Sequence, residues 1–181
     1  PNMTVIVPSD GISTRQALFQ LYQHDGPAYL RLGRPAVPQL HDPGMDFAIG
    51  RAVELRKGKD LSLMACGIMV SKALQAAEIL AAEGIEVSVV DILSIKPLDK
   101  EMIIRKARES GALLTLEEHS IIGGLGSSIC EVVCEHCPGP VTCLGINDLF
   151  GQSGSPEELL QYYGLGIEQI VEKARKLLKK K

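Results

Sequence analysis

The sequence predicts an α/β fold: a three-layer α/β/α domain with a mainly parallel sheet of about five strands, preceded by a partial strand–helix–strand unit. Two observations support this prediction. From residue 51 onward, short apolar segments of strand length alternate with segments of helical periodicity, and only a few residues join them. Before residue 51, a segment rich in proline and glycine follows a shorter strand–helix–strand pattern. Because parallel neighbours need a crossover connection, the alternation indicates right-handed βαβ units with helices on both faces of the sheet.

The smaller unit is predicted to comprise residues 1–33. A β-branched run at 4–7 is typical of a strand, and a turn cluster follows it. Ser13 or Thr14 is expected to cap a helix whose apolar side chains recur at helical spacing. A second strand is predicted at 28–32, after a Gly-Pro pair. A unit of this size is too small to fold alone.

Residues 34–50 are predicted to form a linker. The segment from Gly33 to Asp46 contains three prolines and two glycines, and no periodic pattern of apolar residues continues through it. The larger domain is therefore predicted to comprise residues 51–181.

The larger domain shows five strand patterns and five helix patterns. The strands are predicted at 52–55, 61–65, 87–93, 112–116 and 141–146, and the helices at 71–83, 97–108, 124–136, from 155 and from 167. Gly84 stands where a glycine commonly ends a helix. In the second helix, acidic residues in the first turn and basic residues in the last turn complement the helix dipole.

Composition excludes several classes of function. The chain has 181 residues and a formal net charge of −3, which argues against binding to nucleic acid or to an anionic membrane. No apolar run approaches the roughly 20 residues that span a bilayer, and no secretory pattern opens the sequence. We therefore expect a cytoplasmic location. The five cysteines are an odd number, so reduced thiols are expected rather than a disulfide framework.

Cys130, Cys134 and Cys137 form the most conspicuous local pattern. Their C-x-x-x-C-x-x-C spacing matches the loop that binds a [4Fe–4S] cluster in radical SAM enzymes. However, that motif requires a loop in a larger barrel, whereas Cys130 and Cys134 fall inside a predicted helix. Residues four apart share one helix face, so core thiols are the favoured interpretation and no metal site is expected.

Two further motifs lie where a strand meets a helix. Gly123, Gly124 and Gly126 precede the helix at 124–136, where backbone N–H groups could hold an anion or simply form a tight turn. The tight turn is the favoured interpretation, because the spacing matches no known phosphate-binding pattern.

Glu117, Glu118 and His119 close a strand at its carboxyl end, where open α/β sheets usually place ligands. A carboxylate beside an imidazole can move protons, or it can anchor the loop through hydrogen bonds, and we favour anchoring.

Arg34 follows a predicted strand and stands between Gly33 and Pro35. A guanidinium held at a strand end is suited to bidentate contact with phosphate or carboxylate. A surface ion pair that holds the linker is an equally good interpretation from these residues alone.

Several motifs, in order and spacing, resemble the transketolase family over essentially all 181 residues. They are Pro1-Asn2-x-Thr4-Val5-x-x-Pro8-Ser9-Asp10-Gly11, Arg31-Leu32-Gly33-Arg34-Pro35, Asp46-Phe47-x-Ile49-Gly50, Ile95-Lys96-Pro97-Leu98-Asp99, Glu117-Glu118-His119, Gly123-Gly124-x-Gly126, Gly154-x-Pro156-Glu157-Glu158-Leu159-Leu160 and Tyr163-Gly164-Leu165. The resemblance is closest to the separate C-terminal subunit of split transketolases. 1-Deoxyxylulose-5-phosphate synthase is the next most similar, and the β subunits of 2-oxoacid dehydrogenases are more distant.

The resemblance implies the end of a pyrimidine-binding domain followed by a complete C-terminal domain. Enzymes of this family hold thiamine diphosphate through Mg²⁺ between two chains and transfer a two-carbon ketol unit between sugars, as in the pentose phosphate pathway. It also implies that the cofactor and metal sites lie outside this chain, so that the chain alone has no catalytic residue, binds no cofactor and is an inactive structural or interface domain.

Only Arg34 corresponds to a family site residue, where the resemblance implies contact with the substrate phosphate. Glu117, Glu118, His119, Gly123, Gly124 and Gly126 remain candidates for a loop or interface role. The implied partner is the transketolase N-terminal, diphosphate-binding region or subunit, in a homodimer or heterotetramer. The alternatives are the C-terminal part of 1-deoxyxylulose-5-phosphate synthase and a non-catalytic module that binds a partner protein.

Overall fold

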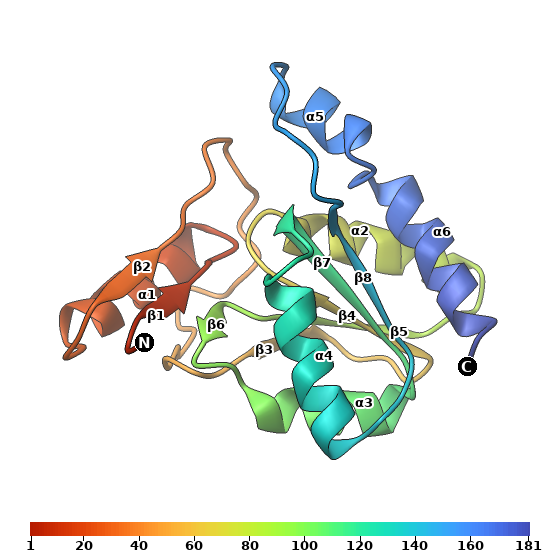
Figure 1. Ribbon diagram of the computed structural model, residues 1–181, viewed down its shortest axis with the longest axis horizontal. Coiled ribbons are helices and arrows are strands. Elements are labelled where there is room, and N and C mark those ends of the chain that lie inside the picture. Colours follow the sequence, from red (N-terminus) through yellow and green to blue (C-terminus); the bar gives the residue numbers. More distant parts are fainter.

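A computed structural model describes all 181 residues. The larger sheet has five strands in the order β3-β5-β4-β7-β8, and four of them are parallel (Figure 1). The edge strand β3 runs antiparallel to β5. The strands are β3 (Val53–Arg56), β4 (Leu61–Ala65), β5 (Val87–Asp91), β7 (Leu113–Ser120) and β8 (Val141–Ile146). The predicted α/β class, with a mainly parallel sheet of five strands, is confirmed.

Helices cover both faces of this sheet (Figure 1). α2 (Met69–Ala82) and α6 (Ile167–Leu178) pack on one face, in a buried cluster of 21 residues. α3 (Lys100–Ser110) and α4 (Leu125–His136) pack on the other, in a cluster of 11. Because side chains alternate along a strand, Leu63 of β4 joins the first cluster and Met64 joins the second. A short helix, α5 (Pro156–Tyr162), precedes α6 and begins with a capping box.

A second sheet joins the N-terminal unit to the larger domain. β1 (Thr4–Ile6) pairs in parallel with β2 (Ala28–Leu30), and β6 (Ser94–Lys96) pairs antiparallel to β1 on its other side. α1 (Gly11–Tyr22) packs against this sheet. The strand expected at 87–93 ends at Asp91 instead. The chain turns there, and the following residues form β6 of the smaller sheet.

α2 begins at Met69, slightly before the expected residue 71, and two other helix starts differ from expectation by a larger margin. α1 begins at Gly11, because Asp10 rather than Ser13 or Thr14 is its N-cap, and Asp10 and Ser13 form a reciprocal capping box. α3 begins at Lys100 rather than at Pro97, because the Asp99 carboxylate caps it by accepting a hydrogen bond from the Met102 N–H. In both cases a carboxylate positioned by its own turn decides the start of the helix.

Residues 34–50 contain no helix or strand, although His41 and Phe47 within this segment are buried. The division into 1–33, 34–50 and 51–181 stays a prediction. None of the helices combines the length and the apolar character needed to cross a membrane.

Candidate functional site

Arg34 lies on a loop that leaves β2 and crosses the surface. The loop comprises residues 33–39, and Arg34 itself is exposed. A guanidinium in this position is free to meet an anionic ligand from solvent. The backbone on either side of the loop is held by specific contacts.

Arg31 holds the start of the loop. Its backbone N–H donates to the carbonyl of Ile6 at 2.9 Å, which extends the pairing of β2 with β1. Its guanidinium donates to the backbone carbonyl of Glu118 at 3.0 Å and lies 3.7 Å from the Glu118 carboxylate. Glu118 thus connects the end of β7 to the beginning of the Arg34 loop.

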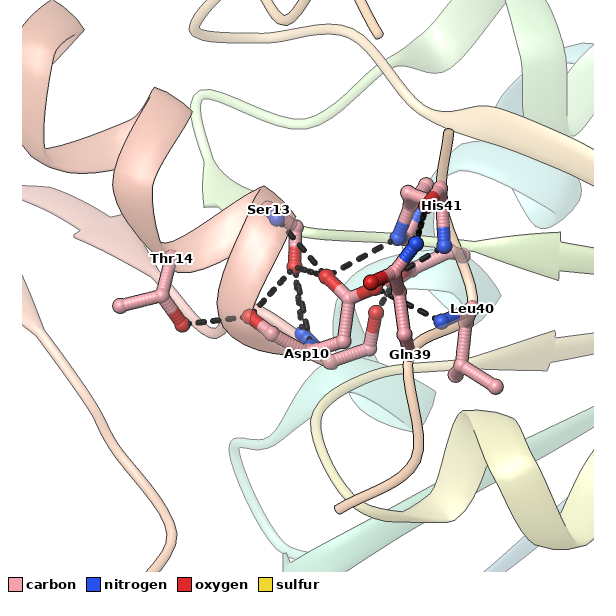
Figure 2. Close-up of polar contacts among 8 residues, drawn as sticks. Asp10, Ser13, Thr14, Gln39, Leu40 and His41 are labelled. Carbon is pink, nitrogen blue, oxygen red and sulfur yellow. Dashed lines mark hydrogen bonds and ion pairs between the residues drawn. The ribbon is translucent and has the colours of Figure 1, made fainter. Parts of the chain in front are cut away.

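Asp10 holds the end of the loop, as Figure 2 shows. One carboxylate oxygen accepts hydrogen bonds from the N–H groups of Leu40 and His41, at 2.7 and 2.9 Å. The other accepts from the Ser13 N–H at 2.7 Å as the helix cap. Burial by itself would raise the pKa of Asp10, but the hydrogen bonds from Ser13, His41 and Leu40 lower it to about 2. Asp10 is therefore a buried carboxylate at the junction of α1 and the linker.

His41 lies between two buried carboxyl groups. Its Nδ1 is 3.2 Å from Asp10 Oδ1, and its Nε2 is 3.4 Å from Asp91 Oδ2. Asp91, at the end of β5, also accepts a hydrogen bond from the Ser9 hydroxyl. Burial raises the pKa of Asp91 well above its ordinary value. Three parts of the chain that are distant in sequence meet at this imidazole.

A cleft of about 500 Å³ separates the N-terminal end of α1 from the Arg34 loop. Pro8, Asp10, Thr14 and Arg15 line one side, and residues 32–37 other than Arg34 line the other. Arg15 is a second guanidinium beside this loop, and its Cζ atom lies 5.7 Å from the centre of the Phe19 ring. The cleft presents a cation to any anion that approaches the loop.

Glu117 caps α4 from inside the protein. Its two carboxylate oxygens accept hydrogen bonds from the N–H groups of Leu125 and Gly126, each at 2.8 Å. Burial raises the pKa of Glu117, and these two hydrogen bonds oppose that rise. The N–H groups at the start of α4 are thus directed at the chain's own carboxylate. Gly126 leaves room for Cys143, whose sulfur would lie 2.7 Å from a Cβ at that position.

Most of the other predicted loop residues surround a single cavity of about 350 Å³. It lies between the smaller sheet and the start of α4, and Glu117, Glu118, His119, Gly123 and Gly124 are among its lining residues. Arg31 and Lys96 contribute cationic groups. Gly126 and Arg34 lie outside this cavity. The Arg34 loop therefore lies outside the cavity beside the glycine-rich loop, and the contact between Arg31 and Glu118 connects the two regions.

The cysteines do not converge. All five are free, and the closest pair is Cys130 and Cys143, whose sulfur atoms are 3.9 Å apart. Burial raises the pKa of Cys130 to about 11. No group of three or more His, Cys, Asp or Glu side chains is placed so that it could hold a metal ion.

Sequence reasoning missed Asp10, His41, Asp91 and Arg31. Asp10 carried a readable signal, because aspartate before a helical pattern is a common N-cap. His41 carried none, because its partners are 31 and 50 residues away in the sequence.

Comparison with known proteins identifies the family. The family model described as transketolase, C-terminal domain, matches residues 50–170. A 6-deoxy-6-sulfo-D-fructose transketolase subunit of Clostridium sp. (strain MSTE9) is 40% identical over all of this chain, which spans 56% of that protein. An apulose-4-phosphate transketolase subunit of Phocaeicola vulgatus is 39% identical over 99% of the chain, which spans 58% of that protein.

A longer relative is a 1-deoxy-D-xylulose-5-phosphate synthase of Pelotomaculum thermopropionicum. It is 40% identical over 94% of this chain, which spans only 28% of that protein. Among solved structures, one described as a split gene transketolase, inactive β4 tetramer, superimposes with a TM-score of 0.96 at 47% identity. It covers 99% of this chain, and the match extends over 59% of that structure's chain. Together with the fold, these matches show that the chain belongs to the transketolase family and corresponds to its C-terminal part.

Proposed function

We propose that the complete enzyme is a transketolase that transfers a two-carbon ketol unit between sugars bearing an anionic group, and that Arg34 binds that group. The observation that carries the proposal is an exposed guanidinium on a loop with both ends anchored, in a chain matched from end to end by transketolase subunits. Two of these relatives are named for a sulfonated sugar and for a sugar phosphate. A terminal anion is the chemistry that a guanidinium recognises.

The family implies thiamine diphosphate as the cofactor, and its ylid would supply the carbon–carbon bond chemistry. Proteins bind Mg²⁺ together with a diphosphate through one or two carboxylates and the phosphate oxygens. The family resemblance places those ligands in the diphosphate-binding region, and in this chain no three His, Cys, Asp or Glu side chains gather around one point. We therefore assign the cofactor site to other parts of the complete enzyme, and expect this chain alone to be inactive.

The partner would be a diphosphate-binding, N-terminal region or subunit. This chain spans a little more than half of the length of the transketolase subunits that it matches. The solved relative is described as a β4 tetramer that is inactive, which supports an oligomer of this type needing a further component. Exposed apolar side chains on α1 and β2, namely Leu18, Phe19, Tyr22 and Tyr29, offer a surface for such packing. Five free thiols support a cytoplasmic location.

The second candidate is the C-terminal part of a 1-deoxyxylulose-5-phosphate synthase, which the 40% identity to the Pelotomaculum protein favours. That reaction also involves a phosphorylated substrate, so Arg34 would keep its role. Assay of the complete enzyme with pyruvate and with ketose donors separates the two candidates.

Calorimetric titration tests the assignment of the cofactor site. The chain is titrated with thiamine diphosphate and Mg²⁺, with and without the N-terminal partner. We expect heat of binding only when the partner is present. Saturable binding to the isolated chain would contradict the assignment.

A further inference from the structure

We propose that Asp10, His41 and Asp91 form a buried, proton-dependent catch that fixes the Arg34 loop, so that His41 is a positioning residue for the anion-binding arginine. The inference rests on the proposed function of Arg34. Its structural part, the catch itself, can be tested in this chain without any substrate.

The first step concerns the backbone. The Arg34 loop ends where the Leu40 and His41 N–H groups donate to one oxygen of Asp10. Asp10 cannot move away, because its other oxygen caps α1 through Ser13. The end of the loop is therefore tied to a rigid helix terminus rather than to another loop. Figure 2 shows Asp10 between α1 on one side and Leu40 and His41 on the other.

The second step concerns the imidazole. The His41 side chain is only 2% exposed. Its Nδ1 lies beside Asp10 and its Nε2 beside Asp91 at ion-pair distance, and neither buried nitrogen has a partner in hydrogen-bond geometry. Asp91 belongs to the end of β5 in the larger sheet, whereas Asp10 belongs to the N-terminal unit. The ring thus bridges the two parts of the molecule while its own backbone closes the loop.

The third step concerns the number of protons shared by His41 and the two carboxyl groups beside it. A neutral imidazole has one N–H and one bare nitrogen, so it can donate to only one of two facing carboxylates. The second nitrogen then faces a carboxylate oxygen without a proton between them, which is repulsive in a buried site. The arrangement therefore requires one more proton, which we place on the Asp91 carboxyl, because burial disfavours its charged form.

The surroundings offer no other charge to replace that proton. The titratable groups that face the ring are Asp10, from the turn before α1, and Asp91, from β5. Beyond the ring, the Ser9 hydroxyl donates a hydrogen bond to Asp91. The buried Cys66 thiol lies after β4, and the charge of Asp91 contributes to raising the pKa of this thiol. No lysine or arginine forms an ion pair with either carboxylate of the cluster. Loss of the proton at high pH should release the ring and loosen the end of the loop.

The test on this chain is amide hydrogen exchange, expressed as protection factors between pH 6 and pH 9. In the wild type, the Leu40 and His41 amides should be protected at pH 6, and their protection factors should fall at least about tenfold by pH 9. His41→Ala should lose it at all pH values. His136→Ala, which removes an exposed histidine from α4, is the matched control and should behave as wild type.

Asp91→Asn distinguishes a proton-dependent catch from simple packing. With its amide nitrogen at the position of Asp91 Oδ2, the asparagine can donate one hydrogen to His41 Nε2 and the other to the Ser9 hydroxyl oxygen, and it carries no titratable proton. This variant should keep Leu40 and His41 protected up to pH 9. Unchanged protection in His41→Ala, or a pH dependence in Asp91→Asn equal to that of wild type, would overturn the catch.

Kinetics of the complete enzyme test the positioning role. His41→Ala should raise KM for the phosphorylated donor by about threefold to tenfold, with kcat and the KM of an unphosphorylated donor unchanged. If Arg34→Ala shows this selectivity but His41→Ala does not, the positioning role is wrong while the proposed function stands. If Arg34→Ala does not raise KM selectively for the phosphorylated donor, the proposed role of Arg34 is wrong. The hydrogen-exchange data then still show whether Asp10, His41 and Asp91 fix the end of the loop.

Discussion

Glu117 and Gly124 are in such close contact that a Cβ at position 124 would overlap Glu117 Oε2. The carboxylate occupies the space in front of α4 that an anionic ligand would otherwise take, because it already binds the first free N–H groups of the helix. The glycine-rich loop and the Glu117-Glu118-His119 motif are thus two halves of one structural contact. This contact sets the path of the chain beside the cavity that Arg31 and Glu118 share.

Gly124→Ala should destabilise the chain by about 2–4 kcal/mol, because the new methyl group must displace a buried carboxylate and its two hydrogen bonds. Denaturant unfolding followed by circular dichroism measures this loss. Gly151→Ala is the control, since a Cβ at Gly151 meets no atom within 4 Å. Equal stability of the two variants would contradict the contact.

Glu117→Ala should cost about 2–4 kcal/mol, because it leaves two buried N–H donors without acceptors. Glu117→Gln should cost less, since its amide oxygen can still accept one of the two hydrogen bonds. The free energy of unfolding of both variants tests this order. A glutamine variant as unstable as the alanine variant would indicate that packing rather than capping is lost.

Asp10 should make stability depend on pH in the acid range. Its pKa is about 2 in the folded chain and 3.8 ordinarily, so the unfolded chain takes up its proton first as the pH falls. The contribution, about 2 kcal/mol, should be complete above about pH 5 and be lost as the pH falls through about 2. The difference in unfolding free energy between wild type and Asp10→Asn should therefore shrink from pH 6 to pH 2.5.

The control for this prediction is Asp25→Asn, because the Asp25 side chain is exposed and has no hydrogen-bond partner in the structure. It should differ little from wild type at any pH in this range. A gap between wild type and Asp10→Asn that is constant with pH would show that Asp10 is not held as a buried carboxylate.

Thiol alkylation should rank the cysteines by environment. Cys134 is exposed and should react first with iodoacetamide at pH 7.5, whereas burial raises the pKa of Cys130 to about 11 and should slow its reaction. Cys66 is buried and should react only after unfolding. Peptide mass spectrometry gives the order. Fast labelling of Cys130 would contradict its position against Cys143.

The local part of this fold could be predicted from the sequence, and the contacts between distant segments could not. Alternating strand and helix patterns indicated the larger sheet, because each element carries its own periodicity. Nothing in the sequence around Ser94 shows that β6 leaves that sheet to pair with β1. The same holds for the site: Arg34 stood out through its neighbours and the family resemblance. His41 could not be predicted as a site residue, because no sequence pattern around a histidine in a proline-rich segment indicates contact with two buried carboxyl groups.

Arg34 should bind the anionic group of the substrate in the complete enzyme, and steady-state kinetics of Arg34→Ala decide whether it does. The two donors are a phosphorylated ketose and an unphosphorylated ketose. Loss of a charge-assisted contact of about 1.5–3 kcal/mol should raise KM for the phosphorylated donor by roughly 10- to 100-fold and leave the other nearly unchanged. Equal changes for both donors would show that Arg34 does not bind this group.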